Sequence, residues 1–192
     1  MTLKPLLLAL LVLPSLASAQ ATPARGLDAR DLVTFERVSS PTLSPDGRFL
    51  VLSVREVDYE ANKASAGLWI ENLRARDAAP PVRFTPEGMN VNSPAFSPDG
   101  AEVWFLSAKS GSSQVWKQAV AGGEPVQVTD YPLDVGTFRL SPDGKQLAVS
   151  FEVFTDCADL ACTKQRLEER AASKATGQLY DKLFVRHWDT WK

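Results

Sequence analysis

The sequence predicts an all-β fold: a partial β-propeller of four-stranded antiparallel blades, with one short surface helix inserted in the third blade. Three observations support this fold class. The phrase Ser-Pro-Asp-Gly occurs three times, at 44–47, 97–100 and 141–144. Each copy lies between an apolar residue and an apolar run, as a turn between two strands does. Successive copies are 53 and 44 residues apart, close to the roughly 40 to 50 residues of one propeller blade.

The repeated phrase has the chemistry of a hairpin turn. Proline fixes φ at the second position of a type I turn, and aspartate suits the third position. Glycine can adopt the positive φ that closes a three-residue hairpin loop. Each copy therefore predicts a strand, a turn and a second strand.

The first segment, 1–19, is expected to be a signal peptide and not part of the fold. One positive charge precedes an apolar run at 6–13 that is too short to span a bilayer. The small residues at 17–19 resemble a cleavage site, so the mature chain would begin at Gln20, with cleavage after Ala21 as the near alternative. A buried apolar helix is the other interpretation. The signal peptide predicts an exported protein, periplasmic or secreted, with no membrane segment after cleavage.

Residues 20–38 form a predicted N-terminal lead. Its first part, 20–30, is polar and is expected to be flexible. In 31–38 the apolar residues recur at helical spacing, and Asp28 could cap a helix there. We expect a short helix over 31–38, with a strand as the alternative.

The first blade is predicted to span 39–85. Its four strands are expected at 41–43, 49–54, 67–73 and 82–85. The polar stretch 58–66 is expected to be a loop. In the second strand Leu50, Leu52 and Val54 alternate, yet Val51 is apolar too, which predicts a sheet covered on both faces.

The second blade, 92–129, repeats this plan. Its four strands are expected at 94–96, 102–106, 114–120 and 126–129. Trp116 aligns with Trp69 of the first blade, and Gly122-Gly123 is expected to form a hairpin turn. Four strands in about 45 residues is the content of one propeller blade.

The third blade, 135–192, is predicted to be partial. Its strands are expected at 137–140 and 146–154, and an insertion at 155–178 then interrupts the pattern. Residues 163–174 of this insertion are good helix formers with few apolar side chains, so we expect a helix on the surface. The aromatic run 179–191 resumes a strand-like pattern.

Both cysteines, Cys157 and Cys162, lie within this insertion. In an oxidising compartment such a pair predicts a local disulfide. It closes a very small loop, so we expect it to hold the base of the insertion and to add little to global stability. A metal site is the weaker alternative, because two thiolates are too few ligands.

The charge balance excludes some classes of partner. The chain has 23 acidic and 21 basic residues, a formal charge of −2. This gives no electrostatic basis for binding nucleic acid or anionic lipid. No cofactor is predicted.

The sequence offers no catalytic set. It lacks the Gly-x-Ser-x-Gly turn of a nucleophilic serine, and its one histidine, His187, is interpreted as a strand residue at a blade surface. The pair Glu168-Glu169 could hold a substrate amine, but a solvated helix face is the preferred interpretation. Blade packing is likewise preferred to a stacking surface for the tryptophans, which are Trp69, Trp104, Trp116, Trp188 and Trp191.

Two blades and part of a third cannot close a ring, which takes about four to eight blades. The last blade would leave an apolar face and a strand edge in water. We therefore expect the sequence to be an N-terminal part of a longer protein, with self-association of short chains into a ring as the alternative.

The repeated phrase, the later tryptophan strand and the closing apolar-Thr pair resemble the blades of two families. One is the N-terminal propeller of the prolyl oligopeptidase family of serine peptidases, and the other is the translocation protein TolB. The runs 152–164 and 180–191 resemble exported bacterial members of the acylaminoacyl-peptidase and dipeptidyl-aminopeptidase branch of the peptidase family. The resemblance covers nearly the whole mature chain, and the third-blade runs are its more specific part.

This resemblance implies a C-terminal α/β-hydrolase domain that carries the catalytic Ser, Asp and His. No catalytic residue is assigned within this chain. The propeller is implied to gate access of short peptides, the substrates of the parent enzyme. Acidic propeller residues hold the substrate's amino terminus in aminopeptidase members, but no residue here is matched to that role. The alternative is a non-catalytic periplasmic propeller, similar to TolB, that binds protein partners.

Overall fold

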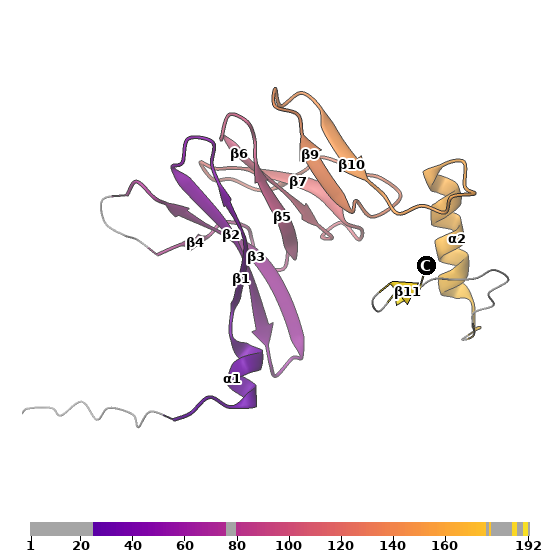
Figure 1. Cartoon of the computed structure of the whole chain (residues 1–192), viewed down its shortest axis with the longest axis horizontal. Coiled ribbons are helices and arrows are strands. Elements are labelled where there is room, and N and C mark those ends of the chain that lie inside the picture. Colours follow the sequence, from indigo (N-terminus) through magenta and orange to yellow (C-terminus); the bar gives the residue numbers. More distant parts are fainter. Residues whose placement is uncertain (1–24, 76–79, 176, 178–185, 188–189, 192) are drawn as a thin grey trace, which may run out of the picture.

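The computed structural model describes residues 25–75, 80–175, 177, 186–187 and 190–191. The predicted signal peptide and most of the run 179–191 lie outside the described residues. Within them, the strands form two four-stranded and two two-stranded antiparallel sheets. Figure 1 shows the two four-stranded sheets and the two-stranded sheet that follows them in a curved row, with helix α2 (Leu160–Ala172) beyond them. No helix in the described part of the chain is long and apolar enough to cross a membrane.

The first sheet has the strand order β1-β2-β3-β4. Its strands are β1 (Arg37–Leu43), β2 (Phe49–Asp58), β3 (Lys63–Asn72) and β4 (Val82–Arg83). Strands occur in all four expected places, although β4 has only two residues. The antiparallel meander is what the turn-separated apolar runs predicted.

The loop expected at 58–66 is wrong. Strands β2 and β3 pair without interruption as far as Asp58 and Lys63, so only 59–62 turns. The Asp58 carboxylate accepts a hydrogen bond from the Ala61 amide at 2.9 Å, and Asn62 has a φ of 50°. The end of this hairpin is polar because it lies in solvent, and its composition therefore resembled that of a loop.

The second sheet repeats this order with β5 (Val91–Phe96), β6 (Glu102–Ser107), β7 (Gln114–Ala119) and β8 (Val126–Gln127). Trp69 pairs with Arg83 and Trp116 pairs with Gln127. The two tryptophans therefore occupy equivalent positions, as their alignment predicted. The Gly122 amide donates to the Ala119 carbonyl at 3.0 Å and closes the expected turn.

The third unit contains β9 (Thr137–Leu140) and β10 (Leu147–Ser150), followed by α2 (Leu160–Ala172) and the short pair β11 (Arg186–His187) and β12 (Thr190–Trp191). The strand expected to reach residue 154 ends at Ser150. The Gly136 amide donates to the Ser150 carbonyl, and β9 offers no further residue for pairing. Helix α2 begins three residues before the expected helix.

The N-terminal lead contains a shorter helix than predicted, α1 (Ala29–Thr34). Asp28 caps it as expected: its carboxylate accepts from the Asp31 backbone amide, and the Asp31 carboxylate accepts from the Asp28 backbone amide. Val38 belongs to β1 because it pairs with Val54. The helix buries none of its residues.

All three Ser-Pro-Asp-Gly turns have the predicted geometry. Their glycines have φ values of 67°, 71° and 69°, at Gly47, Gly100 and Gly144. In the second turn the Ser97 hydroxyl donates to Asp99 at 2.6 Å and accepts from the Glu102 amide at 2.9 Å. The serine and aspartate thereby hold the first residue of the next strand, and the hydrogen bond from Ser97 lowers the pKa of Asp99.

The turns also touch one another between sheets. A Cβ placed on Gly100 would lie 3.4 Å from the ring of Pro45, and one on Gly144 would lie 3.7 Å from the ring of Pro98. Each glycine therefore faces the proline of the preceding turn. The repeated phrase fixes the spacing of the sheets as well as the hairpin within each sheet.

Two apolar clusters fill the spaces between sheets. Between the first and second sheets lie Val51, Leu68, Met89, Val91, Val103, Phe105 and Trp116. Between the second sheet and the third unit lie Leu106, Val115, Val135 and Phe138. The second sheet is thus covered on both faces, whereas Leu43 and Val82 of the first sheet are 54% and 58% exposed.

The lowered pKa of Asp99 predicts a pH-dependent contribution to stability. Such a group stabilises the fold above its unfolded pKa, near 3.8, and this contribution is lost as the pH falls through the lower folded value. Asp99→Asn should therefore lower the unfolding temperature at pH 7, and the difference from wild type should shrink below pH ~4. Thermal unfolding of the full-length protein over pH 3–8 measures this.

The control for that experiment is Glu124→Gln, since the Glu124 carboxylate makes no hydrogen bond or ion pair with the described residues. Its difference from wild type should stay small over the same pH range. A difference for Asp99→Asn that grew on acidification would contradict the assignment.

Candidate functional site

The insertion after β10 is the largest departure from the blade repeat. Residues 151–159 follow the strand without regular structure, and α2 then begins after Asp159. The Asp159 carboxylate accepts from the Cys162 amide at 2.8 Å and caps the helix. The buried hydroxyl of Thr163 lies 3.4 Å from the Phe154 amide, which donates to it. The helix is thereby attached to the segment that leads into it.

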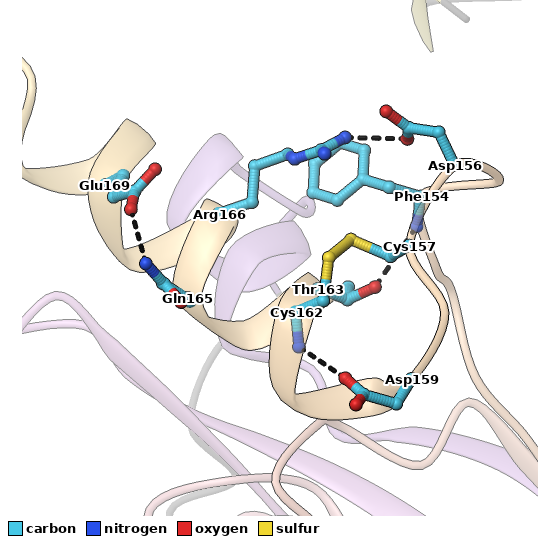
Figure 2. Close-up of a disulfide and its surroundings, with 9 residues drawn as sticks. All are labelled: Phe154, Asp156, Cys157, Asp159, Cys162, Thr163, Gln165, Arg166 and Glu169. Carbon is cyan, nitrogen blue, oxygen red and sulfur yellow. Dashed lines mark hydrogen bonds and ion pairs between the residues drawn. A yellow bond between two sulfur atoms is a disulfide. The ribbon is translucent and has the colours of Figure 1, made fainter.

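The disulfide predicted from the sequence is present. Cys157 and Cys162 are bonded, with their Cα atoms 5.6 Å apart. Figure 2 shows the bond closing the loop that contains Asp159, next to the start of α2. The disulfide joins segment 151–159 to the first turn of the helix, which agrees with the expected local role at the base of the insertion.

A cationic clamp on Phe154 adds to this attachment. The guanidinium carbons of Arg166 and Arg170 lie 4.8 Å and 4.5 Å from the centre of the Phe154 ring. Arg166 also donates to Asp156 at 2.7 Å (Figure 2), and this bond lowers the pKa of Asp156. The sequence interpretation missed this clamp, although two arginines four residues apart share one helix face.

The acidic pair on α2 is placed on the solvated face, as preferred from the sequence. Glu168 and Glu169 are both exposed. The Glu169 carboxylate accepts from the side-chain Nε2 of Gln165 at 2.9 Å, and Glu168 lies 3.9 Å from the Lys164 ammonium. Their hydrogen bonds and ion pairs are local contacts along the helix.

A small cavity of about 220 Å³ lies where the second and third turns meet. It is lined by Ser97, Pro98, Asp99, Glu102, Trp104, Leu140, Asp143 and Gly144. Glu102 is already engaged, since it accepts from the Trp104 indole at 3.2 Å and pairs with Lys117 at 2.9 Å. This cavity is a by-product of the repeated turn, and its charges are already paired or hydrogen-bonded within the turns.

Trp69, Trp104 and Trp116 pack within the blades, as expected. Trp116 is buried, Trp69 lies beneath the Arg83 guanidinium at 5.4 Å, and Trp104 lies beneath the Lys117 ammonium at the same distance. Trp188 lies outside the described residues. The backbone of His187 belongs to β11. Within the described ranges, no group of His, Cys, Asp or Glu side chains is arranged to hold a metal ion.

Comparison with curated proteins finds sequence relatives among peptidases. The chain is 30% identical over 183 residues to dipeptidyl-peptidase 5 of Porphyromonas gingivalis, which covers 92% of this chain and 25% of that protein. It is 27% identical over 125 residues to the uncharacterized peptidase YuxL of Bacillus subtilis, covering 65% of this chain and 19% of that protein. The chain thus spans about a quarter or less of the length of these relatives. No family model matches.

Solved structures show the same fold. The acylaminoacyl peptidase of Pyrococcus horikoshii matches with a TM-score of 0.51 and 18% identity, over 66% of this chain and 20% of that chain. At this identity the likeness concerns the fold alone. Together with the repeated sheets, it shows that the chain forms part of a β-propeller.

Removal of the disulfide should loosen α2 locally. In the double variant Cys157→Ser/Cys162→Ser, amides 160–166 should exchange faster with deuterium, because the first turn of the helix loses its covalent tie. The amides of β6, in the doubly covered second sheet, should keep their protection. Hydrogen exchange followed by mass spectrometry measures both regions, and a loss of protection throughout the sheets would show that the bond has a global role.

Proposed function

We propose that this chain, which forms part of a β-propeller, is the substrate-gating portion of an exported serine peptidase that acts on short peptides. The observation that carries the proposal is the 30% identity to dipeptidyl-peptidase 5 along 92% of the chain. The resemblance of the repeated turn and the third-blade runs to the same family agrees with it. Export rests on the signal peptide predicted at 1–19.

The chemistry is assigned to the rest of the protein. Since the match covers only a quarter of dipeptidyl-peptidase 5, there is room for a separate catalytic domain. We place the catalytic Ser, Asp and His in an α/β-hydrolase domain that follows the propeller. The chain itself would contribute shape and access, and no group that reacts with substrate.

Gating requires that the blades do not separate. The Gln118 side chain, which is 5% exposed, donates to the Phe84 carbonyl of the first sheet at 2.9 Å. The Thr42 hydroxyl donates to the Pro94 carbonyl of the second sheet at 3.2 Å. With the apolar cluster between the sheets, these bonds hold the two sheets together. In a complete propeller such contacts would keep the blades from separating, so peptides would have to enter by a route of fixed width. Long or folded chains would be excluded.

The first test is activity of the full-length protein. It should hydrolyse chromogenic dipeptide substrates, and a fluorophosphonate probe should label one serine outside this chain, because only an activated serine reacts with such a probe. Mass spectrometry identifies the labelled residue. Absence of both label and turnover would contradict the peptidase proposal and favour a binding protein similar to TolB.

The second test concerns the contacts between blades. Gln118→Ala removes a bond between sheets, whereas the control Gln127→Ala removes a bond of similar form within one sheet, from the Gln127 side chain to the Thr129 carbonyl at 2.7 Å. If the propeller gates access, Gln118→Ala should raise cleavage of a peptide of ~20 residues relative to a dipeptide substrate, by severalfold. Gln127→Ala should leave this ratio unchanged. Equal ratios for both variants and wild type would argue against gating by these contacts.

A further inference from the structure

The third strand of the first sheet has a backbone edge that no other strand among the described residues fully covers. Strand β3 runs from Lys63 to Asn72, but β4 pairs only with Trp69 and Ile70. The part of β3 nearer the hairpin end therefore extends beyond its outer neighbour. An uncovered strand edge presents amide and carbonyl groups that can pair with another chain.

The direction of these groups follows from the bonds that are made. The Leu68 amide donates to the Thr85 hydroxyl at 3.0 Å, and the Leu68 carbonyl accepts from the Phe84 amide at 2.8 Å. Both partners lie on the β4 side. Because backbone groups alternate along a strand, those of Ala66 and Ala64 face the same side. The Ala66 amide confirms this, since it donates to the Asn90 side chain at 3.2 Å.

Ala64 is the residue left without a partner on this side. Its amide and carbonyl make no hydrogen bond to the described residues of the 85–90 segment. They face a cavity of about 520 Å³, a size that suits a small ligand or a few peptide residues. The cavity is lined by Glu56, Val57, Asp58, Lys63, Ala64, Ser65, Arg83, Glu87, Gly88 and Asn90.

The second sheet shows that the cavity is not a general feature of the blade. The β6–β7 hairpin is shorter than the β2–β3 hairpin, and Ser113 is the equivalent of Ala66. The Ser113 backbone amide donates to Asp134 at 2.6 Å, and its carbonyl accepts from the Val135 amide at 2.7 Å. The equivalent of Ala64 is Gly111, which lies in the turn, where its amide donates to the Ala108 carbonyl at 3.0 Å. Gln114, which is fully buried, holds the segment leading to the next sheet through the carbonyls of Tyr131 and Leu133.

In the first sheet Gly67 takes the place of Gln114. The Arg83 guanidinium lies against Gly67, where any Cβ would collide with it. An ion pair with Glu56 and the face of Trp69 at 5.4 Å hold this guanidinium in place. The 85–90 segment is joined to the edge through Thr85 at Leu68 and through Asn90 at Ala66, and the long β2–β3 hairpin carries Ala64 beyond these contacts.

The charges of the lining indicate what could enter. Arg83 and Glu56 form an ion pair and neutralise each other. The remaining charged residues of the lining are one cation, Lys63, and two carboxylates, Asp58 and Glu87. The balance is one negative charge, which disfavours an acidic ligand and suits a neutral or basic one. The free amide and carbonyl of Ala64 match the carbonyl and amide of one residue in an extended chain.

We propose that the uncovered edge of β3 at Ala64 binds a short, neutral or basic peptide segment in an extended conformation, as an added strand. The main chain of the peptide provides the affinity, and Glu87 and Asp58 favour a basic side chain. The proposal does not depend on the proposed peptidase activity, because binding is measured without turnover.

The experiment uses the full-length protein and the capped tripeptide Ac-Ala-Lys-Ala-NH₂, with binding followed by calorimetry and the peptide checked by mass spectrometry. Ala64→Pro removes the outward amide without breaking the β2–β3 ladder, since that amide faces away from β2. It should weaken binding about tenfold, the value of one hydrogen bond. The matched control Ala64→Val keeps the amide and should bind as wild type.

Two further measurements do not depend on the fold of the proline variant. A peptide methylated on the lysine backbone nitrogen cannot donate to the Ala64 carbonyl and should bind wild type about tenfold more weakly. Glu87→Lys should lower affinity for the lysine peptide and raise it for Ac-Ala-Glu-Ala-NH₂. Equal binding of methylated and unmethylated peptides, or no binding at millimolar concentration, would overturn the proposal. So would a self-association of the wild type that Ala64→Pro abolishes, because the occupant would then be a second copy.

Discussion

The contact between successive Ser-Pro-Asp-Gly turns is the constraint on which the rest of the structure depends. Within a sheet, the turn holds the start of the second strand through its serine and aspartate side chains. Between sheets, each glycine lies against the proline of the turn before it. Glycine adopts the positive φ of the turn without strain, and this conformation brings it into van der Waals range of the proline ring. One phrase therefore sets both the hairpin and the distance to the neighbouring sheet.

The strand-to-strand plan is the same in both sheets, yet the segments that connect the sheets differ. After the second sheet, buried Gln114 gathers three carbonyl and amide groups of the 129–133 segment. After the first sheet, Gly67 and Arg83 occupy that space, and the connecting segment leaves part of β3 uncovered. The repeat fixes the hydrogen-bonded ladder, whereas the length of each hairpin decides how much of a strand edge extends beyond the connecting segment.

The insertion of the third unit is stabilised by contacts that are nearly all local. Its disulfide, its helix cap and the arginine clamp on Phe154 join residues within 16 positions of one another. Such an element can be added to a propeller blade with little effect on the sheets, because it exchanges few contacts with their clusters. This arrangement suits a surface feature that varies while the scaffold is kept.

The sequence by itself determined the elements whose cause is local. The three turns, the equivalence of Trp69 and Trp116, the cap at Asp28 and the pairing of Cys157 with Cys162 all follow from a few neighbouring residues. Only the tertiary structure decided where strands end, because pairing is a property of two strands: β2 and β3 pair to their tips although those tips are polar, and β10 stops where β9 has no residue left to pair. The same reason explains why the free edge at Ala64 could not be predicted, since it results from how far the β2–β3 hairpin extends beyond the 85–90 segment.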